Sequence, residues 1–155
     1  MQEALTYDDV LLLPQYSDIR SRSEVDISTD LGNGLTLGLP IFSSPMDTIS
    51  ENFMARAISE EGGSAIIHRY NSIEQQSKMV GDAFCGGALN VGAAVGVSGD
   101  FVDRVHAALE QGCRLICVDV AHGHHVMMKD ALETLRQTFG AVSYTHLTLP
   151  TILRV

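Results

Sequence analysis

The sequence predicts an α/β fold in which strands and helices alternate, and two observations carry that prediction. Short apolar runs begin near residues 40, 64, 90 and 114, and each is followed by a segment in which apolar side chains recur at helical spacing. A repeat of roughly 25 residues is the length of one strand–helix unit, and consecutive units build a parallel sheet. Each apolar run also ends in a polar cluster, and ligands bind at the carboxyl ends of parallel strands.

Two architectures fit this series, an open doubly wound sheet and a closed barrel of eight strand–helix units. An open sheet that binds a dinucleotide carries GxGxxG after its first strand, and Ser43-Ser44-Pro45-Met46-Asp47 does not match that motif. Every strand instead ends in its own polar cluster, as in a barrel whose site is built from many loops. We therefore expect a (β/α)8 TIM barrel, of which residues 1–140 form a partial domain with about the first four units.

A short lead-in and a hairpin precede the first unit. Thr6, with Asp9 three residues later and an apolar run after it, is typical of a helix start. Residues 25–29 alternate apolar and polar side chains, which predicts a half-exposed strand. A turn at residues 32–34 (GNG) follows, and residues 35–37 resume the alternation. These segments together predict an N-terminal hairpin that packs against the main fold.

The four units are delimited by residues that start and stop helices. The predicted strands are residues 40–44, 64–67, 90–97 and 114–118, and the predicted helices are residues 51–61, a segment after Ser72, a segment after Asp100 and residues 125–139. Gly62-Gly63 ends the first helix, since glycine is favoured just beyond a helix C-terminus. Ser72 caps the second helix, with Glu74 in its first turn.

The bulk properties argue against several classes of protein. The net charge of −9 does not suit a nucleic-acid-binding surface, because phosphates need a basic face. No apolar stretch approaches the length of a membrane span, and no leader pattern opens the chain. Cys113 and Cys117 flank a predicted strand, form no CxxC pair and are expected in the core. We expect a cytoplasmic protein that binds neither nucleic acid nor membrane.

Five blocks resemble IMP dehydrogenases and GMP reductases. In chain order they are residues 5–14 (LTYDDVLLLP), 43–48 (SSPMDT), 61–63 (EGG) with 67–68 (IH), 91–96 (VGAAVG) and 119–124 (DVAHGH). One block alone is weak, but the ordered set across residues 5 to about 139 is specific. The resemblance implies an eight-unit β/α barrel. It also implies hydride transfer at a purine carbon, with a nicotinamide cofactor and a cysteine that attacks the purine.

The resemblance assigns substrate and cofactor contacts to the strand ends. Ser44 would lie near the phosphate of the purine nucleotide, and Met46 near its base. Asp119 would hydrogen-bond a ribose hydroxyl of NAD, or of NADP in a reductase. His68 would lie beside the nicotinamide. Asp47 could orient its own loop or contact ligand, and both interpretations stay open.

Two small residues complete the cofactor side. Ala121 and Gly123 would leave room for the dinucleotide to approach the fourth strand end. A monovalent cation would be bound by the half of the barrel that this chain lacks. The family further implies a homotetramer when the protein is full length.

The subtype leans towards the dehydrogenase, which converts IMP and NAD to XMP and NADH. The blocks at residues 43–46 and 92–96 look more like dehydrogenases. Residues 79–90 are too short for the CBS modules that these enzymes usually carry, and Asp119-Val120-Ala121 looks more like reductases. GMP reductase, which converts GMP and NADPH to IMP, is therefore the alternative, and both act in purine nucleotide metabolism.

No catalytic residue is assigned within the chain. In the family the catalytic cysteine follows the sixth strand, and none of Cys85, Cys113 or Cys117 has a matching context. Residues 141–155 do not resemble the fifth strand, and residues 142–151 can be back-translated to a sequencing-adapter sequence. We expect a non-native tail produced by adapter read-through, with a genuine strand as the alternative. The fragment itself is expected to be inactive.

Two functions of other classes were weighed. His122 and His124 could face the same way on an extended segment and bind zinc, as in a metal-dependent barrel hydrolase. No carboxylate cluster is evident elsewhere to complete such a site, so no metal is expected. A non-catalytic nucleotide-binding module is the other alternative. His106 lies within a predicted helix and is expected at the surface or partly buried.

Overall fold

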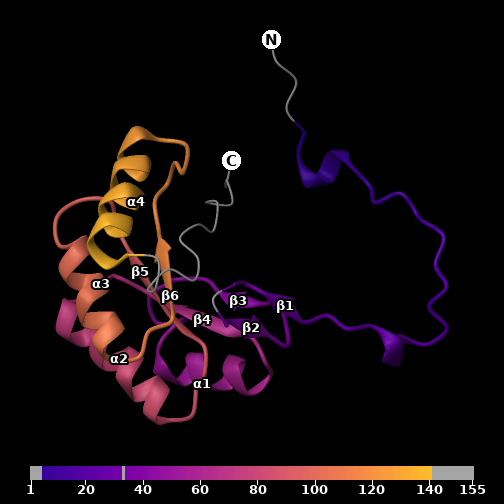
Figure 1. Cartoon of the computed structure of the whole chain (residues 1–155), viewed down its shortest axis with the longest axis horizontal. Helices are drawn as coiled ribbons and strands as arrows, with labels where there is room; N and C mark the ends of the chain where they lie inside the picture. The colour runs from indigo at the N-terminus through magenta and orange to yellow at the C-terminus, as the bar shows by residue number, and fades with distance from the viewer. Residues whose placement is uncertain (1–4, 33, 141–155) are drawn as a thin grey trace.

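The computed structural model describes residues 5–32 and 34–140, and its body is a four-stranded parallel sheet with helices along one side (Figure 1). The strands are β3 (Phe42–Ser43), β4 (Ser64–Ile67), β5 (Val91–Val95) and β6 (Leu115–Val118), and they are paired in chain order. The helices are α1 (Asn52–Glu60), α2 (Ile73–Cys85), α3 (Phe101–Glu110) and α4 (Val126–Phe139). The predicted α/β fold with a parallel sheet is confirmed, and its four units are half the number in a closed barrel.

Three of the helices end in the same way, at glycines placed at equal intervals along the chain. Gly62, Gly87 and Gly112 have φ angles of 89°, 95° and 88°, a left-handed conformation that favours glycine. The residue after each glycine donates its N–H to a carbonyl in the last helical turn: Gly63 to Ile58, Ala88 to Ala83 and Cys113 to Ala108. This is the Schellman motif, and it turns the chain from each helix into the next strand.

The sheet has two buried faces, and side chains alternate between them. Ile67, Val95 and Val118 pack on the face that the helices cover. Ile66, Ala94, Leu115 and Cys117 pack on the opposite face, together with Leu35. β4, β5 and β6 are buried along their whole length and are mostly apolar, because both faces of this part of the sheet are covered.

The predicted hairpin exists and covers the second of these faces. β1 (Thr29–Asp30) pairs antiparallel with β2 (Thr36–Leu37). Arg114 donates to the Gly34 carbonyl at 3.0 Å, and Asn90 donates to the Thr36 carbonyl at 3.3 Å. These two bonds fasten the hairpin to the amino ends of β5 and β6.

The first hairpin strand starts later than predicted. Residues 25–28 lie outside the ladder, and only Thr29 of the expected segment pairs with β2. The Asp26 carboxylate accepts the Ser28 N–H at 2.8 Å, a local bond that replaces strand pairing there. Two of the other predicted strands are also shorter than expected, since β3 and β5 fill only the middle of residues 40–44 and 90–97.

The N-terminal segment extends away from the body (Figure 1). The predicted helix start forms, but only as a single 3-10 turn, Tyr7–Asp9, with the Asp9 carboxylate accepting the Thr6 N–H and hydroxyl at 2.8 Å. The apolar residues that follow are exposed, Leu11 at 94% and Leu12 at 97%, so no packing extends the turn into a helix. None of the helices in the described ranges is long and apolar enough to span a bilayer.

Candidate functional site

The candidate site lies at the carboxyl ends of the four parallel strands. Phe42, Ile66, Ala94 and Cys117 belong to the face that the hairpin covers. By the same alternation, the residues two positions later return to that face, just beyond the strand ends. These residues are Ser44, His68, Gly96 and Asp119. Three of the four are residues for which the sequence predicted a ligand contact.

A buried serine, Ser50, holds the loop after β3 in place. Ser50 is fully buried, and its hydroxyl bonds both the Ser43 hydroxyl, at 2.8 Å, and the Ser44 carbonyl. The Ser44 carbonyl also accepts the Met46 N–H at 2.7 Å. Met46 remains half exposed. The two predicted substrate residues therefore lie on a loop with fixed main-chain geometry and an accessible surface.

Strain is stored in the same loop. Thr48 has a φ of 59°, the left-handed region that β-branched residues rarely adopt. The surrounding structure must hold it there, and such residues cluster at ligand-binding sites. Sequence analysis did not identify Thr48, because no residue type signals a left-handed threonine.

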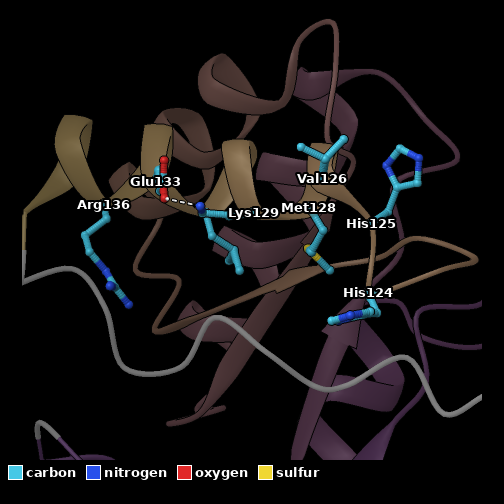
Figure 2. A pocket seen from close by; sticks show the side chains of 9 residues that line it. His124, His125, Val126, Met128, Lys129, Glu133 and Arg136 are labelled. Atoms are coloured by element: carbon cyan, nitrogen blue, oxygen red, sulfur yellow. Dashed lines mark ion pairs between the residues drawn. The ribbon is translucent and has the colours of Figure 1, made fainter.

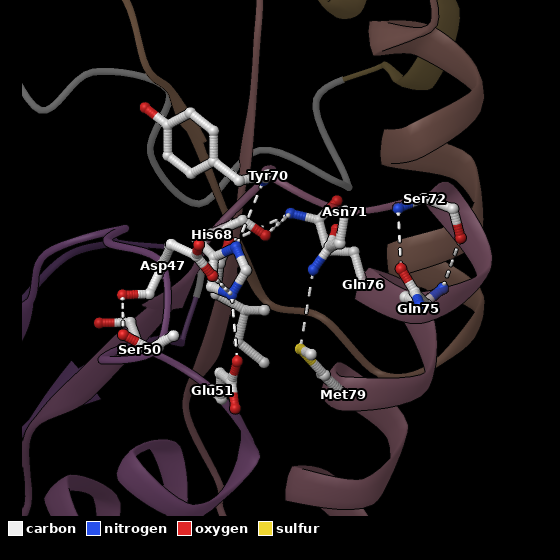
Figure 3. Close-up of polar contacts among 12 residues, drawn as sticks. Asp47, Ser50, Glu51, His68, Tyr70, Asn71, Ser72, Gln75, Gln76 and Met79 are labelled. Carbon is white, nitrogen blue, oxygen red and sulfur yellow. Dashed lines mark hydrogen bonds and ion pairs between the residues drawn. The ribbon is translucent and has the colours of Figure 1, made fainter.

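His68 is buried, with 2% of its surface exposed, and both ring nitrogens are engaged (Figure 3). Its Nε2 lies 3.4 Å from Glu51 Oε1 and 3.6 Å from Asp47 Oδ1. Its Nδ1 accepts the Tyr70 N–H at 3.3 Å. A nitrogen that accepts cannot carry a proton, so the hydrogen is on Nε2 and points at the two carboxylates. The carboxylates thereby fix both the tautomer and the orientation of the ring.

The cluster of Asp47, Glu51 and His68 corrects the expectation that no carboxylate cluster exists in the chain. Their potential ligand atoms lie within 4.8 Å of one another. The hydrogen bonding nevertheless does not suit a metal. A histidine that binds metal through Nε2 normally donates its Nδ1 hydrogen to a neighbour, whereas this Nδ1 faces the donor N–H of Tyr70. The geometry is that of a histidine whose Nε2 faces two carboxylates, and Asp47 lies 3.6 Å from it with 65% of its side chain exposed.

Asp119 is held by an arginine that sequence analysis missed. Arg69 Nε lies 3.6 Å from Asp119 Oδ2, and its Nη2 donates to the Asp119 carbonyl at 3.3 Å. The Asp119 N–H is bonded to the Val95 carbonyl at 2.8 Å. About a third of each side chain remains exposed, 36% for Arg69 and 30% for Asp119. Arg69 directly follows His68, so its position at a strand end was the available signal.

Residues of the loops beyond the strand ends line two hollows. One, of about 160 Å³, is lined by residues including Arg69, Gly96 and Arg104. The other, of about 550 Å³, runs along α4, where His124 and Lys129 line it together with Gly123 (Figure 2). Gly123 thus borders a different hollow from Arg69. Ala121, on the same loop, is exposed.

Among the described residues, the histidines of this loop belong to no group of three side chains with metal-ligand spacing. The His122 ring meets the His125 ring edge-on, with centroids 6.2 Å apart. His125 caps α4, since its Nδ1 accepts the Met127 N–H at 3.1 Å. Across residues 5–32 and 34–140, the only cluster with metal-ligand spacing is the one around His68. His106 is 66% exposed on α3, as expected for a surface residue.

The cysteines behave as predicted. Burial raises the pKa of the Cys113 thiol to about 12. Burial, with a smaller contribution from Asp119, raises the pKa of Cys117 to about 11. Both thiols are therefore protonated near neutral pH, and neither is an activated nucleophile. Cys85 is exposed at the end of α2, away from the carboxyl ends of the strands.

Comparison with known proteins gives one consistent family. The profile of the IMP dehydrogenase / GMP reductase domain matches residues 4–145. An inosine-5'-monophosphate dehydrogenase of Nitrosopumilus maritimus is 48% identical over 79 residues, which cover 51% of this chain and 17% of that protein. A GMP reductase of Leishmania donovani is 50% identical over 80 residues, 52% of this chain and 16% of that protein.

A longer alignment covers most of the chain. An inosine-5'-monophosphate dehydrogenase of Borreliella burgdorferi is 29% identical over 187 residues, covering 89% of this chain and 46% of that protein. The chain thus spans less than half the length of these relatives. The relatives include both activities, so their names do not separate the two subtypes.

Proposed function

This chain belongs to the IMP dehydrogenase / GMP reductase family, and we propose that residues 1–140 are the first four units of its (β/α)8 barrel. The proposed activity is that of an IMP dehydrogenase, in which IMP and NAD give XMP and NADH. One observation carries this proposal: four residues, Ser44, His68, Gly96 and Asp119, follow the carboxyl ends of the parallel strands on the same face of the sheet. A nucleotide and a dinucleotide could lie side by side across these strand ends.

The substrate side is proposed at the loop after β3. Ser44 would contact the nucleotide phosphate, and Met46 would contact the base. The Ser50 bonds to this loop hold its main chain in place before substrate arrives, which lowers the entropy lost on binding. Residues 141–155 lie outside the described residues, and we keep the proposal that they are a non-native tail.

The cofactor side is proposed at β4 and β6. Asp119 is held by its main chain and by Arg69 while a third of its side chain stays open, which suits a ribose hydroxyl. NAD would supply the hydride acceptor. His68, buried and fixed in one tautomer, would lie near the nicotinamide side of the cleft. Ala121 and Gly123 would leave room on the last loop.

The nucleophile is proposed to come from elsewhere in the barrel. Cys113 and Cys117 are buried and protonated, and Cys85 lies at the C-terminal end of α2. We therefore expect this chain to bind nucleotides without turnover, and we keep the family's homotetramer and monovalent cation as proposals for the complete enzyme.

The second candidate is GMP reductase with NADPH, and Arg69 favours it. An arginine next to the ribose-binding acid can accommodate the 2′-phosphate that distinguishes NADP from NAD. Arg69 lies 3.6 Å from Asp119, close enough to contact both that carboxylate and a phosphate beside it. Comparing the affinities for NADH and NADPH would separate the two candidates.

Titration of the purified chain with IMP, GMP, NADH and NADPH tests the proposal. We expect saturable binding of one purine nucleotide and one cofactor. Asp119→Asn should weaken cofactor binding by about tenfold, the loss of one hydrogen bond to a charged group. Asp82→Asn is the matched control, because Asp82 pairs with Lys78 on the exposed side of α2. Absence of saturable binding by all four compounds would overturn the proposed function.

A further inference from the structure

A buried glutamine ties together the ends of two neighbouring strands. Gln76, on α2, is fully buried. Its side-chain NH2 lies within hydrogen-bond distance of three carbonyls, Ile67 at 3.1 Å, His68 at 3.0 Å and Ala94 at 2.8 Å, so its two hydrogens are shared among them. Figure 3 shows Gln76 beside His68. The first two belong to the end of β4 and the third to the end of β5. The Gln76 side chain thus fixes the end of β4 relative to the end of β5.

An arginine on the next helix sets the direction of this glutamine. Arg104, on α3, is 7% exposed, and its Nη1 donates to Gln76 Oε1 at 3.1 Å. A guanidinium can only donate, so the amide oxygen must face Arg104 and the amide nitrogen must face the carbonyls. Arg104 Nη2 also donates to the Asn71 carbonyl at 3.1 Å and to Asp100 Oδ2 at 2.7 Å.

The network costs stability that an apolar core would not. Burying the Arg104 guanidinium and the Gln76 amide is costly, although Asp100 stays 52% exposed, and apolar side chains of similar size often stabilise as well or better. What the polar network adds is a defined geometry for residues 67–71, which it holds at both ends, through Ile67 and Asn71. That segment carries His68 and Arg69.

We propose that Gln76 and Arg104 are positioning residues for the cofactor side of the site. They act through the main-chain carbonyls of Ile67, His68 and Asn71. Their bonds set where the His68 ring meets Glu51 and where the Arg69 guanidinium meets Asp119. The inference rests on the proposed function for the identity of the ligand. The geometry that it concerns can be measured without any ligand.

Two variants and one control separate positioning from simple stability. Arg104→Met and Gln76→Met remove the polar bonds and keep side-chain volume. Arg56→Met is the control, because Arg56 also joins two helices, donating to the Asp82 carbonyl at 2.6 Å, but it contacts no strand end. Nitrogen-15 spectra of the histidine rings report the His68 tautomer, and titrations report affinities for cofactor and IMP.

We expect both methionine variants to lose the His68 signal of an Nε2-protonated ring that accepts the Tyr70 N–H. NADH or NADPH affinity should fall by about tenfold or more, because small misplacements of binding groups are costly, while IMP affinity changes less than about twofold. Arg104→Lys, which keeps the charge but has a single donor nitrogen, should show an effect between those of Arg104→Met and the unaltered chain. Arg56→Met should lower the melting temperature without either effect.

Two results would overturn the positioning role: an unchanged His68 signal in folded Arg104→Met, or equal effects of the Arg104 and Arg56 variants. If Arg104→Met does not fold, Arg104→Lys gives the same comparison. If the unaltered chain binds no cofactor, the proposed function fails. The His68 signal then still decides whether Gln76 and Arg104 hold the ring.

Discussion

At the scale of single residues, burial makes two of the three thiols less reactive than the third. The pKa of Cys113 is raised to about 12 and that of Cys117 to about 11, while Cys85 is exposed. Iodoacetamide at pH 8 should therefore label Cys85 within minutes and the other two only as the protein unfolds, because the thiolate is the reactive form. Mass spectrometry of peptides would measure this. Rapid labelling of Cys117 in the folded chain would contradict its exclusion as a nucleophile.

The same thiols predict a decline in stability at alkaline pH. A thiol whose pKa is raised by folding contributes its full stabilisation at pH values below the ordinary thiol pKa of 9.0. This contribution is lost as the pH rises towards the folded pKa, about 11 for Cys117 and about 12 for Cys113. Each thiol should lower the free energy of unfolding by up to about 1.4 kcal/mol per pH unit in that window. Urea unfolding at pH 8, 9 and 10 would measure it. A Cys113→Ala, Cys117→Ala double variant should show a shallower decline; an equal slope would contradict the assignment.

Residue types at strand ends predicted part of the candidate site. His68 and Asp119 stand in the polar clusters that follow two apolar runs, and the family resemblance assigned them their roles. Glu51 and Arg69 were not, because their importance depends on which strand end each one meets in three dimensions. The Asp47–Glu51 spacing alone gave no reason to expect a histidine between them. Whether the predicted residues bind ligand stays a prediction.

At the scale of elements, the three glycine helix ends differ in how tightly they are packed. A Cβ added at Gly62 would lie 3.2 Å from the Leu39 nitrogen, whereas one added at Gly87 would meet nothing within 4 Å. Gly87→Ala should cost only the strain of a positive φ, about 1–2 kcal/mol. Gly62→Ala should lower the free energy of unfolding by more, because the backbone at Leu39 must also move aside. Urea unfolding would compare them, and equal costs would show that this backbone gives way freely.

Strand centres were easier to predict than strand ends. β4 and β6 are buried on both faces, so their apolar runs predicted them to within a residue. The strand at residues 25–29 was predicted from alternation alone, and the Asp26 side chain, which bonds its own backbone, shifted its start. The capping serine of α2 was correctly identified, because Ser72 accepts the Gln75 N–H. Local side-chain bonds decide such boundaries, and apolar patterns do not report them.

At the scale of the whole molecule, one face of the sheet is closed by helices and the other by a hairpin. The repeat of apolar runs predicted the helical face, since each unit supplies one strand and one covering helix. It did not predict that Leu35 would lie against Ile66 and Leu115. That contact joins segments far apart in the chain. The hairpin's position follows from its bonds to Asn90 and Arg114, which no local pattern reveals.

The exposed N-terminal segment predicts self-association. Leu11, Leu12 and Leu13 are 94%, 97% and 81% exposed, and a contiguous apolar stretch of this kind tends to be covered by another surface. β3 and β6 are edge strands in the part of the sheet that the structure describes, and they offer unpaired backbone groups. The purified chain should therefore sediment as larger species as its concentration rises.

Leu11→Ser with Leu12→Ser should shift sedimentation towards the monomer if the apolar segment drives association. Leu89→Ser is the matched control, since Leu89 is 71% exposed but stands alone at the end of a loop. A scattered apolar residue adds little to association, so the control should sediment like the parent. If the double variant associates as strongly as the control, the sheet edges and not the N-terminal segment would be the contact. Substituting Lys at the edge positions of β6 would then be expected to release the monomer.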